Sequence, residues 1–77
     1  MDPLQAINNY FKGTLKPGDM VSNGNGLLTV KRVNARGITT TTGTQYDFTE
    51  IAPVENGAAV TARALSQKIV EYNKAAK

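Results

Sequence analysis

The sequence predicts an α+β protein: a β-rich core over residues 17–54, a short helix before it over residues 3–12 and a longer helix after it over residues 57–75. Three observations lead to this prediction. Apolar residues recur every three or four positions near both ends of the chain, as on one face of a helix. Between them, runs of β-branched residues alternate with turns rich in Gly and Asn, as in antiparallel strands. A length of 77 residues fits one domain, 1–77.

The first predicted helix has a start signal and one apolar face. Asp2 can cap the first turn, and Pro3 suits the first helical position. Three apolar residues follow at helical spacing: Leu4, Ile7 and Phe11. We expect Gly13 to end this helix, because Gly commonly stands just past the last helical residue.

Five strands are expected in the core. They are placed at 20–21, 27–33, 38–42, 45–49 and, after a short turn, within 50–54. The second and third strands form a hairpin through a turn at 34–37, in which Gly37 suits a left-handed conformation.

The second predicted helix starts at Asn56-Gly57, with Asn56 as its cap. Its apolar stripe has spacings of three and four and consists of Ala58, Ala62, Leu65, Ile69, Tyr72 and Ala76. We expect the stripe to pack on the core or on the first helix. Val60 and Val70 lie away from it, and two interpretations remain open: isolated exposed residues, or a wider apolar face that touches a second partner.

Four segments of the core carry a resemblance to a known fold. They are Lys16-Pro17-Gly18-Asp19-Met20-Val21, Val30-Lys31-Arg32-Val33 with Arg36-Gly37-Ile38, Gly43 to Phe48, and Ile51-Ala52-Pro53-Val54. In this order they resemble the opening strand, central hairpin, next strand and closing strand of an SH3-like small β-barrel of the KOW and Tudor-like kind. The resemblance implies a five-stranded barrel flanked by the two helices. Such barrels bind nucleic acids, peptides or methylated side chains and also host catalysis, so the fold does not choose among these functions.

Composition excludes several classes of protein. Because the chain has no Cys and no His, a disulfide cannot form and a zinc, copper or iron–sulfur site is excluded; no cofactor is expected. No apolar run approaches the ~20 residues of a membrane span, and the N-terminal residues lack the pattern of a secretory signal. We therefore expect a cytoplasmic protein, in the host cytoplasm if it is viral. A methyl-lysine cage is not expected either, since Tyr46 and Phe48 are the aromatic residues of the core and both are predicted to point inward.

Basic residues supply the candidate partner-binding positions. The net charge is +3. One group lies on the predicted 31–37 hairpin and consists of Lys31, Arg32 and Arg36. The other lies opposite the apolar stripe of the second helix and consists of Arg63, Gln67 and Lys74. Each group is either a contact surface for an acidic partner or nucleic acid, or an ordinary solvated face.

Two further features have weaker functional interpretations. Asp47 and Glu50 are the nearest pair of carboxylates, but no nucleophile or base accompanies them, so we expect no catalytic residues. The loop at 23–26, Asn-Gly-Asn-Gly, could cradle an anion through its amides, but it lacks the Gly-Lys-Ser/Thr ending of a phosphate loop and no helix follows it, so a turn between strands is the favoured interpretation.

The leading hypothesis is a non-catalytic protein-binding module, of the kind a phage encodes as an accessory or regulatory protein that binds a host factor. The alternative is a nucleic-acid-binding module of the KOW type that uses the 31–37 hairpin and the basic helix. A third hypothesis, an enzyme that forms its site between barrel copies, requires self-association, and weak homo-oligomers remain open.

Overall fold

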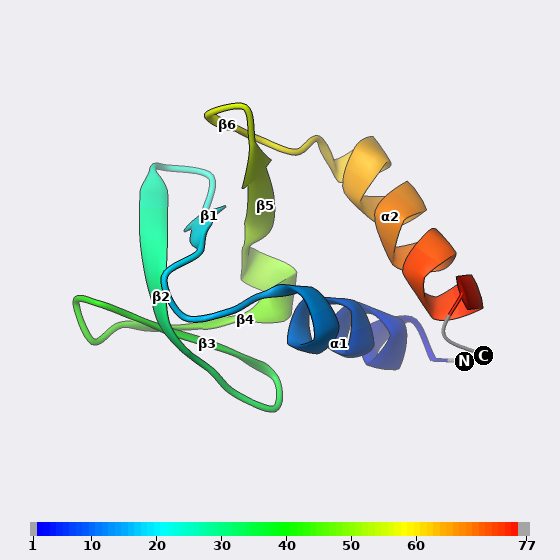
Figure 1. Cartoon of the computed structure of the whole chain (residues 1–77), viewed down its shortest axis with the longest axis horizontal. Helices are drawn as coiled ribbons and strands as arrows, with labels where there is room; N and C mark the ends of the chain where they lie inside the picture. The colour runs from blue at the N-terminus through cyan, green and yellow to red at the C-terminus, as the bar shows by residue number, and fades with distance from the viewer. Residues whose placement is uncertain (1, 76–77) are drawn as a thin grey trace.

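The structure is a computed structural model that describes residues 2–75. It has the predicted α+β class: an N-terminal helix, a curled antiparallel sheet and a longer C-terminal helix (Figure 1). The elements are α1 (Pro3–Thr14), β1 (Met20–Ser22), β2 (Leu27–Val33), β3 (Gly37–Thr40), β4 (Gln45–Asp47), the 3-10 turn η1 (Phe48–Glu50), β5 (Ala52–Glu55), β6 (Ala58–Ala59) and α2 (Ala62–Ala75).

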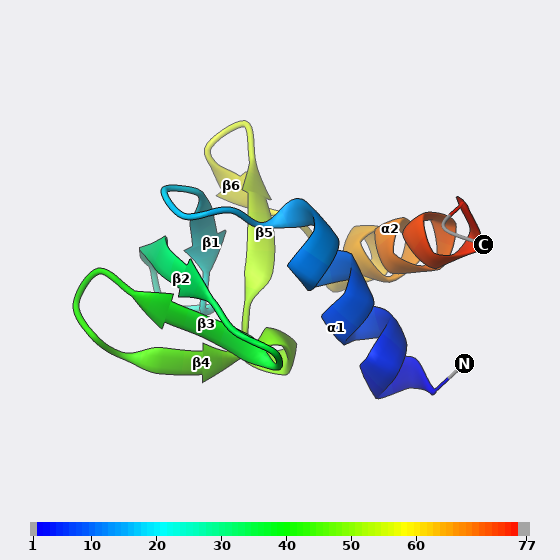
Figure 2. The same cartoon turned by 60° about the horizontal axis from the view of Figure 1, so that its bottom comes forward.

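The six strands form one sheet in the order β4-β3-β2-β1-β5-β6. All neighbouring strands are antiparallel, and β1 is central because Val21 stands opposite both Leu28 of β2 and Pro53 of β5. The sheet curls into a half-barrel whose edges are β4 and β6. Both helices lie on one side of it, with α1 the nearer (Figure 2).

Two local features shape the sheet. The register between β2 and β3 shifts between Val30 and Arg32, and the extra residue of such a bulge bends its strand. At the start of β3, a Cβ on Gly37 would overlap the backbone carbonyl of Tyr46 on β4. The prediction that Gly37 is left-handed is wrong, since its φ is not positive. Glycine is needed there because the two strands approach too closely for a side chain.

The buried core is built by the sheet and by α1 together. Its six most buried apolar residues are Phe11, Val21, Val30, Ile38, Phe48 and Ile51. Phe11 of α1 stacks on Phe48 with ring centroids 5.2 Å apart. Phe48 is not in a strand as predicted, because β4 ends at Asp47 and the chain turns into η1. That turn aims the Phe48 ring at the helix.

Helix α1 continues past its predicted end. It includes Gly13 and stops at Thr14, whose hydroxyl donates to the Tyr10 carbonyl at 2.7 Å. Leu15 is the C-cap, and Pro17 follows two residues later, where proline is common because it cannot continue a helix. At its start, the predicted cap is confirmed: the Asp2 carboxylate accepts a hydrogen bond from the Leu4 amide at 3.2 Å.

The predicted start of the second helix is wrong. Asn56 and Gly57 have φ of 54° and 79°, which makes them the two central residues of a tight hairpin turn between β5 and β6. This hairpin adds the sixth strand, where five were expected. Helix α2 begins at Ala62, with Thr61 accepting from the Ala64 amide at 3.2 Å. Ala58 therefore lies in a strand, and Ala76 lies outside the described residues.

Candidate functional site

Helix α2 packs mainly on α1, through an aromatic contact. The Tyr72 ring meets the Tyr10 ring edge to face, with centroids 5.7 Å apart and planes at 84°. The Tyr72 hydroxyl lies over Gly13, where a side chain would overlap it. The predicted apolar stripe thus docks on the first helix, but not through Leu4, which is half exposed at 50%.

Two polar contacts fix the position of α2. The side-chain amide of Asn73 donates to the carbonyls of Ala6 on α1, at 3.0 Å, and of Ile69, at 2.8 Å. At the sheet, Lys68 forms an ion pair of 2.8 Å with Glu55 of β5. The hydrogen bond and charge of Glu55 raise the pKa of Lys68 above its usual value of 10.5. The charge of Lys68 is therefore used within the fold.

Between the two helices lies an open groove of about 480 Å³. Its walls are apolar except for one serine and consist of Pro3, Ala6 and Ile7 from α1 and Ala62, Leu65, Ser66, Ile69 and Val70 from α2. Val70 is 62% exposed at the rim. The groove leaves apolar side chains in contact with water on a domain whose core is small.

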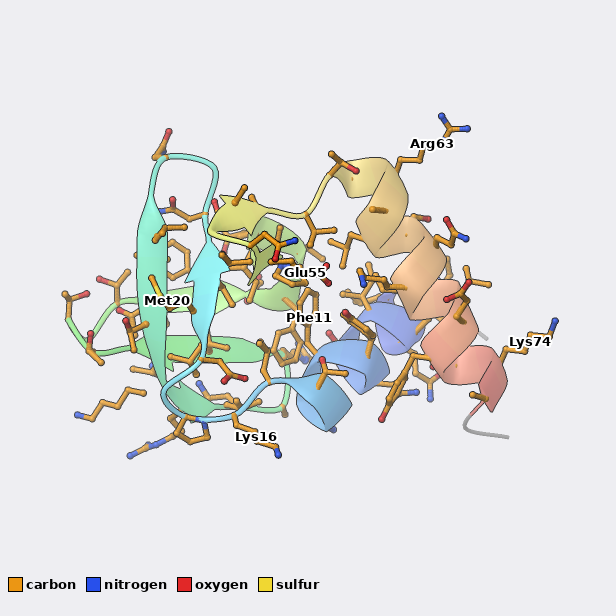
Figure 3. The ribbon with its side chains drawn as sticks, turned by 45° about the horizontal axis from the view of Figure 1, so that its top comes forward. Phe11, Lys16, Met20, Glu55, Arg63 and Lys74 are labelled. Carbon is orange, nitrogen blue, oxygen red and sulfur yellow. The ribbon has the colours of Figure 1, made fainter. Side chains whose placement is uncertain are left out.

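The predicted basic group of α2 borders this groove. Lys74 follows Val70 by four residues and Arg63 precedes it by seven, so all three lie on one side of the helix. Figure 3 shows Arg63 and Lys74 pointing outward from the two ends of α2, away from the sheet. Gln67 donates a 3.4 Å hydrogen bond to Glu71 and thus turns toward its own helix. Arg63 and Lys74 therefore do not line the groove but lie beside Val70, outside its rim.

The other predicted basic group is not part of this surface. Lys31, Arg32 and Arg36 are all exposed on the β2–β3 hairpin. Because the bulge lies between Val30 and Arg32, it leaves the two successive residues Lys31 and Arg32 both facing solvent. Helix α1 lies between this hairpin and α2 (Figures 1 and 2). The structure therefore does not bring the two predicted groups together.

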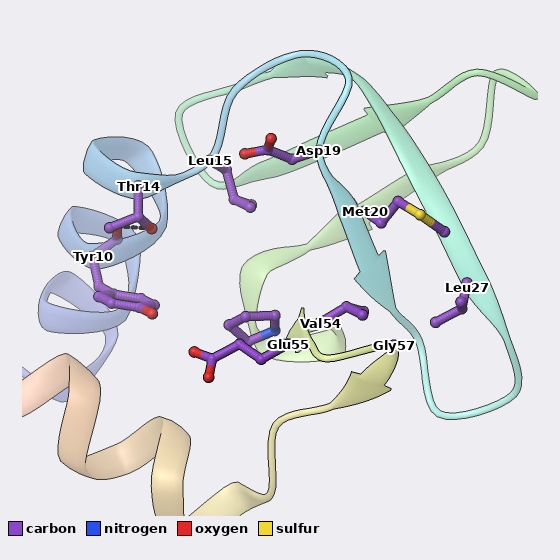
Figure 4. Close-up of a pocket in the computed structure, with 10 residues that line it drawn as sticks. Tyr10, Thr14, Leu15, Asp19, Met20, Leu27, Val54, Glu55 and Gly57 are labelled. Atoms are coloured by element: carbon purple, nitrogen blue, oxygen red, sulfur yellow. Dashed lines mark hydrogen bonds between the residues drawn. The ribbon is translucent and has the colours of Figure 1, made fainter.

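A second hollow, of about 490 Å³, lies between the end of α1 and the outer face of the sheet (Figure 4). Met20 and Leu27 line it and are 45% and 49% exposed. Its two carboxylates have structural partners: Asp19 accepts from the Lys16 amide at 3.0 Å, and Glu55 is paired with Lys68. Both carboxylates among the described residues of this hollow thus take part in structural contacts, and Asp19 remains exposed.

The two weaker candidates have structural roles. Glu50 accepts a hydrogen bond from the Asp47 amide at 2.9 Å, so this carboxylate caps η1. In the 23–26 loop, the Asn23 side chain accepts from the amides of Asn25 and Gly26 at 2.9 and 3.0 Å, and Ser22 accepts from Gly24 at 3.2 Å. These amides are engaged by side chains and are not arranged to hold an anion.

Within residues 2–75, no three acidic side chains come together as metal ligands. Neither helix in this part of the chain has the length and apolar character needed to cross a membrane. Comparison of the chain with protein-family models, with curated proteins and with solved structures found no match.

Sequence reasoning missed the groove because it depends on how two distant helices meet. Its α1 wall, Pro3, Ala6 and Ile7, lies more than 50 residues from its α2 wall. One signal is present in the sequence: Val70 lies outside the predicted apolar stripe, which fits either an isolated exposed residue or a wider apolar face. The structure places Val70 at the rim of the groove, next to the stripe.

Proposed function

We propose that this chain is a non-catalytic protein-binding module and that the groove between α1 and α2 is its docking surface. The observation that carries the proposal is the apolar lining of this open groove, with Val70 62% exposed at its rim. A small-molecule site normally combines an apolar lining with several convergent polar groups. Among the lining residues that lie within 2–75, Ser66 is the one polar residue, which favours a partner that presents an apolar surface of its own.

The state of the acidic side chains supports a non-catalytic role. Asp19, Glu50 and Glu55 each have a structural partner, as a cap or in an ion pair. A general acid or base needs a carboxyl group that can reach a substrate and exchange its proton. We also propose the finer description of the fold, an SH3-like barrel. The pairing of β1 with both β2 and β5, and the 3-10 turn before β5, support that description.

Site-specific photocross-linking tests the function. A benzophenone amino acid would replace Val70 at the groove and, as a matched control, the exposed Thr41 in the β3–β4 turn. In extracts of cells that express the protein, we expect a polypeptide adduct at position 70 that excess unlabelled protein suppresses. Equal labelling at both positions, or no adduct at position 70, would rule out the groove as a protein-docking surface.

The second candidate is nucleic-acid binding through the 31–37 hairpin, favoured by the bulge that exposes both Lys31 and Arg32. Phosphate contacts of this kind weaken steeply with salt. If the hairpin binds nucleic acid, replacing Lys31, Arg32 and Arg36 with Ala should abolish binding to DNA or RNA and remove its salt dependence. Replacing Arg63 and Lys74 should have little effect. Binding that the triple replacement leaves unchanged would exclude this candidate.

A further inference from the structure

The groove between α1 and α2 has the dimensions of a site for one helix. Its apolar wall follows α2 from Ala62 to Val70, which at 1.5 Å per residue is about 12 Å. An amphipathic helix presents anchors at positions i, i+3 or i+4, and i+7, which span about 10 Å. Three anchors of a docked helix would therefore fit along this wall.

The strand edges of the sheet are less suited to receive a partner. A strand added to a sheet needs a row of free backbone groups. At the β4 edge, the Asp47 amide already donates to the Glu50 side chain at 2.9 Å. At the other edge, β6 has two residues, Ala58 and Ala59. Neither edge offers the extended row of groups that strand addition requires, so a helix is the better occupant.

The charges at the groove define the partner's chemistry. Arg63 and Lys74 border the exposed rim and are 11 residues apart on α2, or about 16 Å along its axis. The Glu71 carboxylate accepts from Gln67, which shares a side of α2 with Arg63 and Lys74, so it offsets part of their positive charge. Lys68 is paired with Glu55. A partner helix therefore meets positive charge near both ends of its apolar stripe.

These charges also argue against a second copy of the chain as the occupant. If the groove of one copy packed on the groove of another, Arg63 and Lys74 of both copies would come together. The chain as a whole has a net charge of +3, so repulsion acts at long range as well.

We infer that the groove binds an acidic amphipathic helix of a protein partner, with apolar anchors between the helices and carboxylates facing Arg63 and Lys74. This inference rests on the proposed function. It goes further in specifying the partner's secondary structure and charge, both of which can be tested with synthetic peptides.

Three 18-residue peptides, each cross-linked to hold a helix, serve as probes. The first has Leu at i, i+3 and i+7, the three anchors that fit the groove, and Glu along one flank. The second has Lys in place of each Glu, and the third has Ser in place of each Leu. Binding is measured by fluorescence anisotropy and located from amide shifts in NMR spectra of the labelled protein. We expect the acidic peptide to bind at least about fivefold more tightly than the basic one, as two exposed charge pairs allow. The shifts should centre on Ile7, Ser66 and Val70, and the Ser peptide should not bind.

Charge reversal supplies the decisive comparison. The double variant Arg63→Glu with Lys74→Glu should prefer the basic peptide. The matched control, Lys12→Glu with Lys31→Glu, changes the net charge equally at exposed positions away from the groove and should keep the preference for the acidic peptide. Val70→Asp should weaken the binding of both peptides more than tenfold, because it places a charge at an apolar contact.

The outcomes separate the inference from the function on which it rests. If the basic peptide binds the wild-type groove as tightly as the acidic one, or if charge reversal leaves the preference unchanged, the inference is wrong while protein binding stands. If neither Leu peptide shifts the groove amides although position 70 cross-links to a partner, that partner does not bind as a helix, and the inference is again wrong. Absence of any cross-link at position 70 removes the proposed function itself.

Discussion

The hydroxyl of Tyr72 on α2 occupies the space that a side chain would fill at Gly13 on α1. The Tyr72 ring is held there by its edge-to-face contact with Tyr10. Gly13 lies within α1, where Gly weakens a helix, and its φ is not positive. Glycine at this position is therefore explained by the close approach of α2.

Replacing Gly13 with Ala should destabilise the wild-type protein. The same replacement should stabilise a protein that lacks the Tyr72 ring. Displacing the Tyr72 ring costs about 1–3 kcal/mol as an overpacking effect, whereas Ala in place of Gly in a helix contributes about 0.5–1 kcal/mol. We expect a net loss in the free energy of unfolding, measured by urea denaturation. In a Tyr72→Ala background, the same replacement should stabilise the protein. If Gly13→Ala destabilises both backgrounds equally, Tyr72 is not the cause.

Replacing Gly37 with Ala should destabilise the protein more strongly, because the overlapping atoms belong to the backbone. The new methyl group would meet the Tyr46 carbonyl, and β3 and β4 must separate to admit it. We expect a loss of about 3 kcal/mol. Gly43→Ala is the matched control: its φ is 90° but its surroundings are open, so about 1–2 kcal/mol of backbone strain is expected. Equal losses at both positions, measured by thermal unfolding, would contradict the role of close approach.

The class of the fold follows from local patterns. The spacing of Leu4, Ile7 and Phe11 predicts a helix at the start of the chain, and the β-branched residues of 27–33 predict the longest strand. Both predictions are confirmed. They could be made from the sequence because side chains on one face recur about every 3.6 residues in a helix and every two residues in a strand. The bounds are less accurate: α1 includes Gly13, and β3 ends at Thr40, two residues before the expected position.

The predicted start of α2 was wrong because the dipeptide Asn56-Gly57 is compatible with both a helix start and a hairpin turn. Asn can cap a helix, but Asn followed by Gly also favours a hairpin turn in which both residues have positive φ. The alanines after Asn56-Gly57 fit the helical stripe, which favoured the helix. In the structure, Ala58 and Ala59 pair with Glu55 and Val54 of β5. This pairing is local to the Asn56-Gly57 turn, so the hairpin signal was the correct one of the two.

The candidate site was predictable only in part. Arg63 and Lys74 share one side of α2, as the helical spacing predicted. Their proximity to an apolar groove depends on the docking of α2 through Tyr10, Tyr72 and Asn73, which is a tertiary contact. The basic hairpin was likewise predicted as an exposed group, but nothing in the sequence indicates that α1 lies between it and α2.

Helix α1 should be required for the sheet to fold. Phe11 is 1% exposed and stacks on Phe48 at the centre of the core. Phe11→Ala should lower the free energy of unfolding by about 3–5 kcal/mol, a large part of the total for a domain of this size. Lys12→Ala, at the exposed neighbouring position, should change it by less than about 0.5 kcal/mol. Urea denaturation of both variants gives the comparison. A Phe11→Ala protein as stable as the Lys12→Ala control would show that the sheet does not need the helix.

The ion pair between Lys68 and Glu55 should contribute a stability that disappears at alkaline pH. Because folding raises the pKa of Lys68 above its usual 10.5, the stabilisation is fully present below pH 10.5. It is lost as the pH rises through the still higher pKa of the folded state, where the amine loses its charge. Lys68→Gln should therefore be less stable than the wild type at pH 7–9. The two proteins should converge as the pH passes the raised pKa of Lys68 in the folded state.

The measurement is the difference in urea midpoint between wild type and Lys68→Gln across this pH range. The two proteins differ only at position 68, so the contributions of the rest of the chain cancel in the difference. Lys12→Gln, at an exposed position on α1, is the control and should follow the wild type at every pH. Added salt should also reduce the difference at neutral pH, because Lys68 and Glu55 are both more than one-third exposed. If the difference persists unchanged above the pKa of Lys68, the side chain stabilises α2 through its apolar stem and not through its charge.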